Sequence, residues 1–263
     1  EWSDDHLGFY LTVADDFARW YREARRKNDA VGNSVNLISL LARIGAVETA
    51  CNIPQAGVEG FGSLSGLTSK QSCIIERLVE LSLANHKTIV YAKSPRLLNI
   101  IARELTARGI ASVLLHGERN IIERTNDLNV NFRFGKVPVL LASLGCAQTG
   151  LNISQADRVI FASRDWSAKT ERQAKARVLR PQQERPVTVE YVHLPGSIDN
   201  YQAQLVRWKG SAADAGLDWA TPETDTESFA HIDHILGEFV ANCAAYRGLE
   251  PHALREILKG KAA

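Results

Sequence analysis

The chain has 263 residues, of which 45% are hydrophobic and 23% are charged, and these proportions are typical of a soluble globular protein. Its formal net charge is +1, so the overall field does not favour nucleic acid, and any DNA contact must come from locally placed groups. No apolar run is long enough to cross a membrane. The absence of a C-x-x-C pair argues against a zinc site and a disulfide framework and favours reduced thiols for Cys51, Cys73, Cys146 and Cys243.

Residues 1–67 are expected to form an N-terminal helical segment and a Gly-rich linker. Apolar side chains recur at helical spacing over residues 7–28, and a second helix is predicted over residues 34–51, before Pro54. The first helix is also basic, so it could lie along a phosphate backbone, although a solvated basic face explains the same pattern. The glycines of residues 57–66 lack the spacing of a dinucleotide-binding loop and indicate a linker.

Residues 68–209 show alternating helices and strands. Helices are expected over residues 69–85, 94–109 and 119–132. Strands are expected over residues 88–92, 112–115, 137–142, 158–162 and 187–193. This alternation predicts an α/β fold, a parallel sheet with right-handed crossovers and helices on both faces. Ligands of such sheets gather at the carboxyl ends of the strands.

Residues 210–263 are expected to form a C-terminal helical extension. A helix from Ile198 leads into a polar stretch over residues 210–226, and two helices follow over residues 229–246 and 251–258. The pair His231 and His234 lacks a third ligand, so a solvated helix face explains it better than a metal site.

Two segments of the central region carry candidate chemistry. Residues 165–189 read D-W-S-A-K-T-E-R-Q-A-K-A-R-V-L-R-P-Q-Q-E-R-P-V-T-V, and a short helix there would place Gln173, Arg177 and Arg180 on one face. Two neighbouring Arg side chains can clamp phosphate oxygens, although a solvated helix face is the alternative. Residues 143–152 form a loop of small residues in which backbone N–H groups and the hydroxyls of Ser143 and Thr149 could approach an anion. An ordinary Gly-bearing turn is the alternative there.

Both segments resemble motifs of the Swi/Snf family of DNA translocases, which belongs to superfamily two of the nucleic-acid-dependent ATPases. The last helicase motif of that family typically reads W-N-P-A-x-x-x-Q-A-x-x-R-x-x-R-x-G-Q-x-x-x-V. Seven residues of this chain match it without a gap, namely Trp166, Ala168, Gln173, Ala174, Arg177, Arg180 and Gln183. Residues 143–152 resemble the fifth motif, S-x-x-A-G-G-x-G-L-N. This chain departs from the two motifs with Leu144, Gln148, Ala176 and Pro181-Gln182.

The resemblance implies a RecA-like lobe and assigns roles to individual residues. Arg177 and Arg180 would reach the γ-phosphate of ATP as arginine fingers. ATP would bind in a cleft between this lobe and a second RecA-like lobe. Three residues of this chain would complete the nucleotide side of that cleft, namely Gln173, Gly150 and Asn152. Five residues would grip the DNA backbone, namely Lys93, Ser94, Arg119, Ser143 and Thr149.

The sequence also lacks motifs that a complete motor needs. A translocase requires a G-x-x-x-x-G-K-[ST] loop and an acidic pair for Mg²⁺. The Gly-Lys pairs of this chain, Gly135-Lys136 and Gly260-Lys261, are not followed by Ser or Thr. We therefore expect a C-terminal lobe that is inactive alone, with ATP and Mg²⁺ held mainly by an absent N-terminal RecA-like lobe. DNA and that lobe are the expected partners, a membrane is not, and the cytoplasm is the preferred compartment, or the nucleus in a eukaryote.

Two alternatives stay open at this point. The chain could be a non-catalytic module that binds nucleic acid or protein on a retained RecA-like fold. It could also be a stand-alone doubly wound domain that binds a small nucleotide. The hypothesis of a stand-alone domain predicts measurable ATP affinity for the chain alone, whereas the lobe hypothesis predicts weak or no affinity.

Overall fold

The computed structural model describes residues 1–29, 36–117, 120–147, 153–181, 183, 185–217, 225–246 and 248–260. The chain divides into two compact units. The first comprises residues 70–193, and the second comprises residues 1–69 together with 194–263. The division at residues 67/68 and 209/210 that the sequence suggested stays a prediction. Within the part of the chain that is described, no helix is both long enough and apolar enough to cross a membrane.

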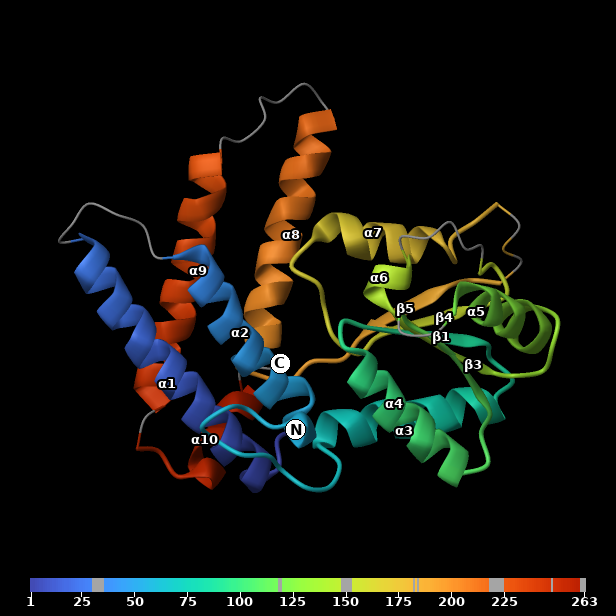
Figure 1. The fold of residues 1–263 in the computed structure, drawn as a ribbon, viewed down its shortest axis with the longest axis horizontal. Coiled ribbons are helices and arrows are strands. Elements are labelled where there is room, and N and C mark those ends of the chain that lie inside the picture. The colour runs from blue at the N-terminus through green and yellow to red at the C-terminus, as the bar shows by residue number, and fades with distance from the viewer. Residues whose placement is uncertain are drawn as a thin grey trace. The chain divides into compact units, whose positions relative to one another are not determined.

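A five-stranded parallel sheet forms the centre of the first unit (Figure 1). Its strands are β1 (Thr88–Ala92), β2 (Ser112–Leu115), β3 (Val139–Ser143), β4 (Arg158–Phe161) and β5 (Thr188–Tyr191), in the order β2-β3-β1-β4-β5. The central strand β1 pairs with β3 on one side and with β4 on the other. The register sets Ala92 opposite Ser143 and Tyr91 opposite Phe161. The carboxyl ends of these three strands therefore meet at one edge of the sheet.

Helices cover both faces of this sheet (Figure 1). The helices α3 (Ser69–Leu83) and α4 (Pro95–Ala107) lie on one face. The opposite face carries α5 (Ile121–Asp127), α6 (Leu144–Ala147) and α7 (Ala168–Ala176). All five residues of β1 are buried, as expected for a strand between two helical layers. The RecA-like α/β fold predicted from the sequence is confirmed.

Three elements of this unit differ from the expectation. The helix predicted over residues 119–132 is α5 followed by a π-helical segment, η2 (Leu128–Arg133). The side chain of Lys87 binds the carboxyl end of this segment, because its Nζ donates hydrogen bonds to the carbonyl oxygens of Phe132 and Gly135. The strand β3 starts at Val139 and includes Ser143, and the short helix α6 follows it where a loop was expected.

The second unit is helical. It contains α1 (Asp4–Asp29), α2 (Leu37–Asn52), the 3₁₀ turn η1 (Pro54–Ala56), α8 (Ile198–Leu217), α9 (Asp225–Tyr246) and α10 (Pro251–Gly260). The helix α1 packs against α2, α9 and α10, and α8 packs against α2 and α9. Phe17 of α1 contacts Phe239 of α9 with 5.8 Å between ring centroids. The N–H of Ile198 donates to the Tyr10 hydroxyl at 2.9 Å, so α8 is tied to α1.

Two predicted irregular stretches in this unit are more ordered than expected. The helix α8 continues to Leu217 and α9 begins at Asp225, so only part of residues 210–226 lies between helices. The expected linker contains a tight turn, in which the N–H of Val58 donates to the carbonyl of Gly62 at 2.8 Å. Gly60 and Gly62 have φ values of 81° and 80°, which side chains other than glycine rarely adopt.

Candidate nucleotide and nucleic-acid site

Three of the predicted DNA-contacting residues lie together at the carboxyl edge of the sheet. Lys93 and Ser94 directly follow β1, and Ser143 ends the neighbouring strand β3. Lys93 is exposed and Ser94 is half-buried, whereas Ser143 is only 7% exposed. The N–H of Lys93 donates to Ser163 Oγ at 2.8 Å, which connects the turn after β1 to the turn after β4.

Ser94 occupies the N-cap position of α4, but its side chain makes no capping hydrogen bond. A serine at this position usually accepts from a backbone N–H of the first helical turn. The hydroxyl of Ser94 is therefore not committed to its own helix. Together with the ammonium group of Lys93, it can contact an anion such as a backbone phosphate.

The helix α7 begins at a well-formed cap after β4. The N–H of Ser167 donates to Asp165 Oδ1 at 2.9 Å, and Ser167 Oγ accepts from the N–H of Thr170 at 3.4 Å. This arrangement satisfies two backbone donors that a helix start leaves without a partner. The start of α7 is thereby fixed just past the carboxyl end of β4.

A buried ion pair attaches α7 to the turn that follows β4. Arg164 Nε donates to Glu171 Oε1 at 2.8 Å, and Arg164 Nη2 donates to Glu171 Oε2 at 2.7 Å. The side chains are 13% and 3% exposed. The guanidinium carbon of Arg164 also lies 4.6 Å from the centre of the Tyr191 ring. Burial, followed by the charge of Glu171, raises the pKa of Tyr191 above its ordinary value.

Aromatic side chains of three neighbouring strands continue this arrangement. The ring of Tyr191 stacks on Phe161 with 4.9 Å between centroids, and Phe161 stacks on Tyr91 at 5.5 Å. The Tyr91 hydroxyl donates to the carbonyl of Ala174 on α7 at 3.3 Å. Burial raises the pKa of Tyr91, and the positive charge of nearby Arg177 partly offsets that rise. The guanidinium group of Arg177 therefore acts electrostatically on the tyrosine under α7.

The predicted phosphate clamp differs from the expectation in two respects. First, α7 ends at Ala176, so Gln173 lies on the helix, Arg177 caps it and Arg180 lies beyond it. Pro181 accounts for the position of Arg180 outside the helix, because the residue before a proline is disfavoured in the helical conformation. Second, α7 runs back from the carboxyl end of β4 toward the amino end of β5. Arg177 and Arg180 therefore follow α7 on the side of the amino end of β5.

Several contacts hold the residues from Arg177 to Gln183, here called the arginine segment, in place. The N–H of Ile153 donates to the carbonyl of Arg177 at 2.9 Å. The amide Nε2 of Gln183 donates to the carbonyls of Ser154 and Ala156 at 2.9 and 2.7 Å. Gln183, which the resemblance placed in the last motif, thus links this segment to the residues that lead into β4.

Arg180 is half-buried and has an unsatisfied donor. Its Nε is buried and has no hydrogen-bond partner. Among the described residues, Arg180 also forms no ion pair with a carboxylate. An orphaned guanidinium donor of this kind fits an acceptor such as a phosphate oxygen. The remaining predicted site residues lie outside the described part of the chain, namely Arg119, Thr149, Gly150 and Asn152.

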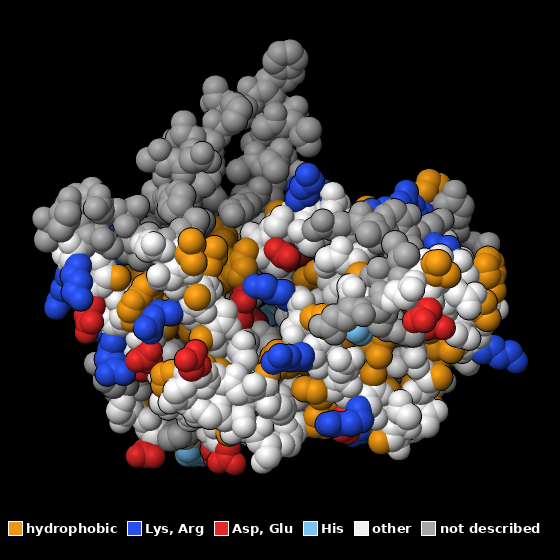
Figure 2. Space-filling model, in the orientation of Figure 1, with side chains coloured by type: hydrophobic (Ala, Val, Ile, Leu, Met, Phe, Trp, Pro, Cys, Tyr) orange, Lys and Arg blue, Asp and Glu red, His pale blue; other side chains and the backbone are white. Residues whose placement is uncertain are grey.

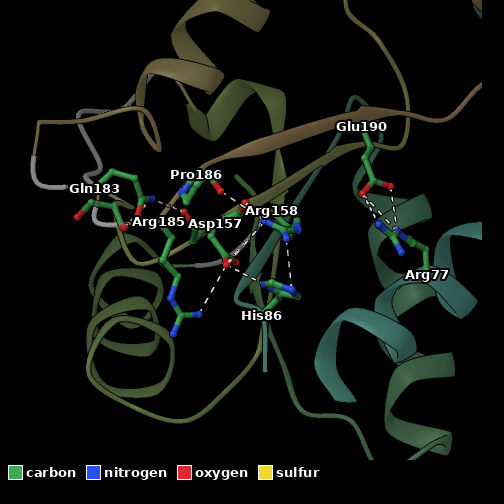
Figure 3. Close-up of polar contacts among 10 residues, drawn as sticks. Arg77, His86, Asp157, Arg158, Gln183, Arg185, Pro186 and Glu190 are labelled. Atoms are coloured by element: carbon green, nitrogen blue, oxygen red, sulfur yellow. Dashed lines mark hydrogen bonds and ion pairs between the residues drawn. The ribbon is translucent and has the colours of Figure 1, made fainter. Parts of the chain in front are cut away.

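A second charged cluster lies at the amino edge of the sheet (Figure 3). His86 Nδ1 lies 2.7 Å from Asp157 Oδ2, and the same oxygen is 3.8 Å from Arg158 Nη1 and 3.6 Å from Arg185 Nη1. Arg158 Nη2 lies 3.3 Å from His86 Nε2. If His86 is neutral, it donates from Nδ1 to Asp157 and accepts from Arg158 at Nε2. This cluster connects the residues before β1, β4 and β5, and nothing in the sequence pattern indicated it.

Charged side chains of the described residues form no single large patch on the face shown in Figure 2. On the face shown in Figure 2, Lys and Arg side chains are scattered among acidic and apolar ones. This distribution agrees with the net charge of +1. A nucleic-acid contact on this chain would therefore depend on a few placed groups, such as those at the carboxyl edge of the sheet.

Comparison with known proteins finds similar sequences and a similar fold. The helicase conserved C-terminal domain family matches residues 69–182. The chain is 24% identical over 161 residues to the chromatin-remodeling ATPase INO80 of Vanderwaltozyma polyspora, covering 61% of this chain and 10% of that protein. It is 29% identical over 132 residues to INO80 of Schizosaccharomyces pombe, covering 50% of this chain and 8% of that protein. The chain therefore spans about a tenth of the length of these curated relatives.

The fold is also similar to a solved structure, the Sulfolobus solfataricus SWI2/SNF2 ATPase core in complex with dsDNA. The TM-score is 0.60 at 19% sequence identity, and the match covers 80% of this chain and 42% of that chain. The parallel sheet is thus that of a RecA-like fold. The matches to the helicase conserved C-terminal domain and to the INO80 ATPases support a resemblance of this chain to the C-terminal lobe of Swi/Snf-family ATPases of superfamily two.

Proposed function

We propose that this chain is the second motor lobe of an ATP-dependent DNA translocase of the Swi/Snf type. The observation that supports this proposal most strongly is Arg180, whose buried Nε has no partner although the surrounding segment is held by several hydrogen bonds. A buried donor left without a partner costs free energy, on the order of 1–3 kcal/mol. An incoming phosphate oxygen would remove that cost.

In this proposal Arg177 and Arg180 act on a nucleotide that another lobe holds. As the two lobes close, the guanidinium groups approach the γ-phosphate and stabilise the charge that develops on it. Arginine fingers of this kind raise hydrolysis rates by about 10³–10⁵. Gln173, four residues before Arg177 on α7, lies where it can contact the same nucleotide. Gly150 and Asn152 belong to this site by resemblance alone.

ATP and Mg²⁺ are assigned mainly to the first lobe of the parent protein. The described residues include no group of three His, Cys, Asp or Glu side chains that could hold a metal ion. Arg177 and Arg180 suit the phosphate groups of the nucleotide but not the cation. Mg²⁺ supplies further neutralisation of phosphate charge when it is bound.

The DNA-contacting surface is proposed at the carboxyl edge of the sheet, where Lys93, Ser94 and Ser143 lie together. Arg119 and Thr149 join them by resemblance alone. These groups suit phosphate oxygens, so binding should be largely independent of base sequence and strongly dependent on salt. Because Arg177 and Arg180 follow α7 and lead toward the amino end of β5, we propose that DNA and nucleotide bind to different surfaces of the lobe. Cleft closure over the nucleotide could then shift the lobe along the DNA.

The compartment follows from the parent protein. The relatives named above are chromatin-remodeling ATPases of fungi, whose substrate would be nuclear. The preference for the cytoplasm that the sequence suggested gains no support from them. A nuclear location is therefore proposed if the parent protein is eukaryotic.

Nucleotide titration tests the proposal that ATP is bound mainly by the first lobe and not by this chain alone. The isolated chain should show weak or no affinity for ATP and no hydrolysis with or without DNA. The full-length protein should bind ATP and hydrolyse it faster when DNA is added. Tight ATP binding by the chain alone would favour a stand-alone nucleotide-binding domain. Absence of DNA-stimulated hydrolysis in the full-length protein would favour a non-catalytic module.

A further inference from the structure

The contacts around α7 form a closed circuit between the helix and three strands. Starting at Glu171, the circuit passes through Arg164 to Tyr191 of β5, to Phe161 of β4, to Tyr91 of β1, and returns to α7 at the carbonyl of Ala174. Every step is an ion pair, a hydrogen bond or a ring contact. The helix is therefore held at two points, almost one turn apart.

Arg164 is the member of this circuit that contacts both Glu171 and Tyr191. Its fork makes two parallel hydrogen bonds to Glu171, while the face of the same guanidinium group lies over Tyr191. Lysine has a similar charge but neither the planar fork nor the flat face. Glu171 lies in the first turn of α7, where the helix dipole also favours a negative charge. The pair thus fixes both the position and the rotation of the helix start.

This attachment bears directly on the arginine segment. Arg177 follows Ala174, the second anchored residue, by three positions, and its charge already acts on Tyr91. A rotation or a shift of α7 would therefore move Gln173 and Arg177 together. A misplacement of a catalytic group by about 1 Å can lower a rate on the order of 10²-fold.

We propose that Arg164 is a positioning residue for ATP hydrolysis, which acts through Glu171 and Tyr191 to orient α7 and the two arginines that follow it, Arg177 and Arg180. This inference rests on the proposed function, because it assumes that Arg177 and Arg180 act on a nucleotide. It assigns no contact with nucleotide or DNA to Arg164. Loss of the Arg164–Glu171 pair should therefore lower turnover without weakening the binding of either ligand.

A second Arg–Glu pair in the same unit provides a matched control. Arg77 of α3 donates to both carboxylate oxygens of Glu190, with Nε–Oε2 and Nη2–Oε1 distances of 3.1 and 2.8 Å (Figure 3). Glu190 precedes Tyr191 on β5, so its side chain points to the opposite face of the sheet. The control pair has the same chemistry and includes the neighbour of Tyr191 on β5, but it is attached to α3. The described contacts of Glu190 do not connect it to α7.

The experiment measures kcat and KM for ATP with saturating DNA, the Kd for DNA and the Tm of the full-length protein. The variants are Arg164→Lys, Glu171→Gln and the double substitution, compared with Arg77→Lys and Glu190→Gln. We expect each Arg164 or Glu171 variant to lose about 10–100-fold in kcat. KM and Kd should stay within about twofold, and the double variant should be no slower than the slower single variant. The Arg77 and Glu190 variants should keep kcat, although their Tm decreases.

Two further variants keep the inference testable if the buried-charge variants fold poorly. Tyr191→Leu removes the ring under Arg164 and leaves the ion pair intact, so kcat should fall. Tyr191→Phe keeps that ring and removes only the hydroxyl, which hydrogen-bonds to Glu171, so kcat should fall less than in Tyr191→Leu. Wild-type kcat in Arg164→Lys or Tyr191→Leu would overturn the inference, as would equal losses of kcat in the control pair. The proposed function fails separately, if the wild-type protein shows no DNA-stimulated hydrolysis or if Arg180→Ala hydrolyses ATP normally.

Discussion

The hydroxyl of Tyr91, on the central strand of the sheet, donates a 3.3 Å hydrogen bond to the carbonyl of Ala174 on α7. This bond joins the fully buried centre of the fold to the helix that leads into the arginine segment. A core residue, Tyr91, is thus hydrogen-bonded to a helix residue that precedes Arg177 by three positions. A change that weakens this hydrogen bond should therefore affect both the stability of the sheet unit and the position of Arg177.

Removing this hydroxyl should have a modest and measurable effect on stability. In Tyr91→Phe the ring contact with Phe161 remains, but the carbonyl of Ala174 loses its side-chain donor. We expect the free energy of unfolding in urea to decrease by about 1 kcal/mol. An unchanged urea midpoint in Tyr91→Phe would show that this bond does not stabilise the fold.

The amino-edge cluster should stabilise the sheet unit through Asp157. This carboxylate is 4% exposed and lies among His86, Arg158 and Arg185. In Asp157→Asn the negative charge is lost while cationic groups stay around it, so we expect unfolding to become easier by roughly 3 kcal/mol. Arg185→Ala should cost less than about 1 kcal/mol, because the Arg185 side chain is 66% exposed. Equal effects of the two substitutions in urea unfolding would contradict this ranking.

The thiol groups should differ sharply in reactivity. Cys73 is exposed, whereas Cys51, Cys146 and Cys243 are buried. Burial raises the pKa of Cys243 to about 12, so little thiolate is present at neutral pH. We expect a thiol reagent at pH 8 to modify Cys73 rapidly and Cys243 only after unfolding. Mass spectrometry of the modified peptides checks this order, and rapid labelling of Cys243 would contradict it.

The same pKa shift predicts the direction of an alkaline effect on stability. The pKa of Cys243 is higher in the folded chain, about 12, than its ordinary value of 9.0. The unfolded chain therefore releases this proton first as the pH rises. The contribution of the neutral thiol to stability is complete below about pH 9 and is lost as the pH approaches 12. The difference in unfolding free energy between wild type and Cys243→Ala should decrease over this range, and a constant difference would contradict the assignment.

The proposed DNA surface predicts a change in salt dependence. In the full-length protein, Lys93→Ala should weaken DNA binding and reduce the slope of log K against log salt by about 1, because one phosphate contact is lost. Arg103→Ala removes an exposed charge from α4 and should leave the slope unchanged. Binding curves at several salt concentrations measure both slopes. Equal slopes in wild type and Lys93→Ala would remove Lys93 from the proposed surface.

The sheet was predictable because its strands are short apolar runs between turn residues. The strands β1 and β2 have the bounds expected from the sequence, Thr88–Ala92 and Ser112–Leu115. The presence of an arginine segment was equally predictable, but its geometry was not. The helix α7 ends at Ala176, and Pro181 disfavours the helical conformation for Arg180, so the spacing that suggested one continuous helix face does not hold over its whole length.

The contacts that hold the site could not be derived from the sequence. Arg164 and Glu171 are seven residues apart across the start of a helix, and no periodic pattern connects them. Charged residues are ordinarily expected at the surface, so their burial is visible only in the fold. His86 and Asp157 are 71 positions apart and meet only because β1 and β4 are neighbours in the sheet.

The most direct test of the account is DNA-stimulated ATP hydrolysis by the full-length protein carrying Arg180→Ala, with Arg172→Ala on the exposed side of α7 as the control. The account predicts that kcat decreases by about 10³-fold or more in Arg180→Ala, that DNA affinity is unchanged, and that the control hydrolyses ATP normally. Normal hydrolysis by Arg180→Ala, or a loss of DNA binding together with hydrolysis, would contradict the role of Arg180 as an arginine finger.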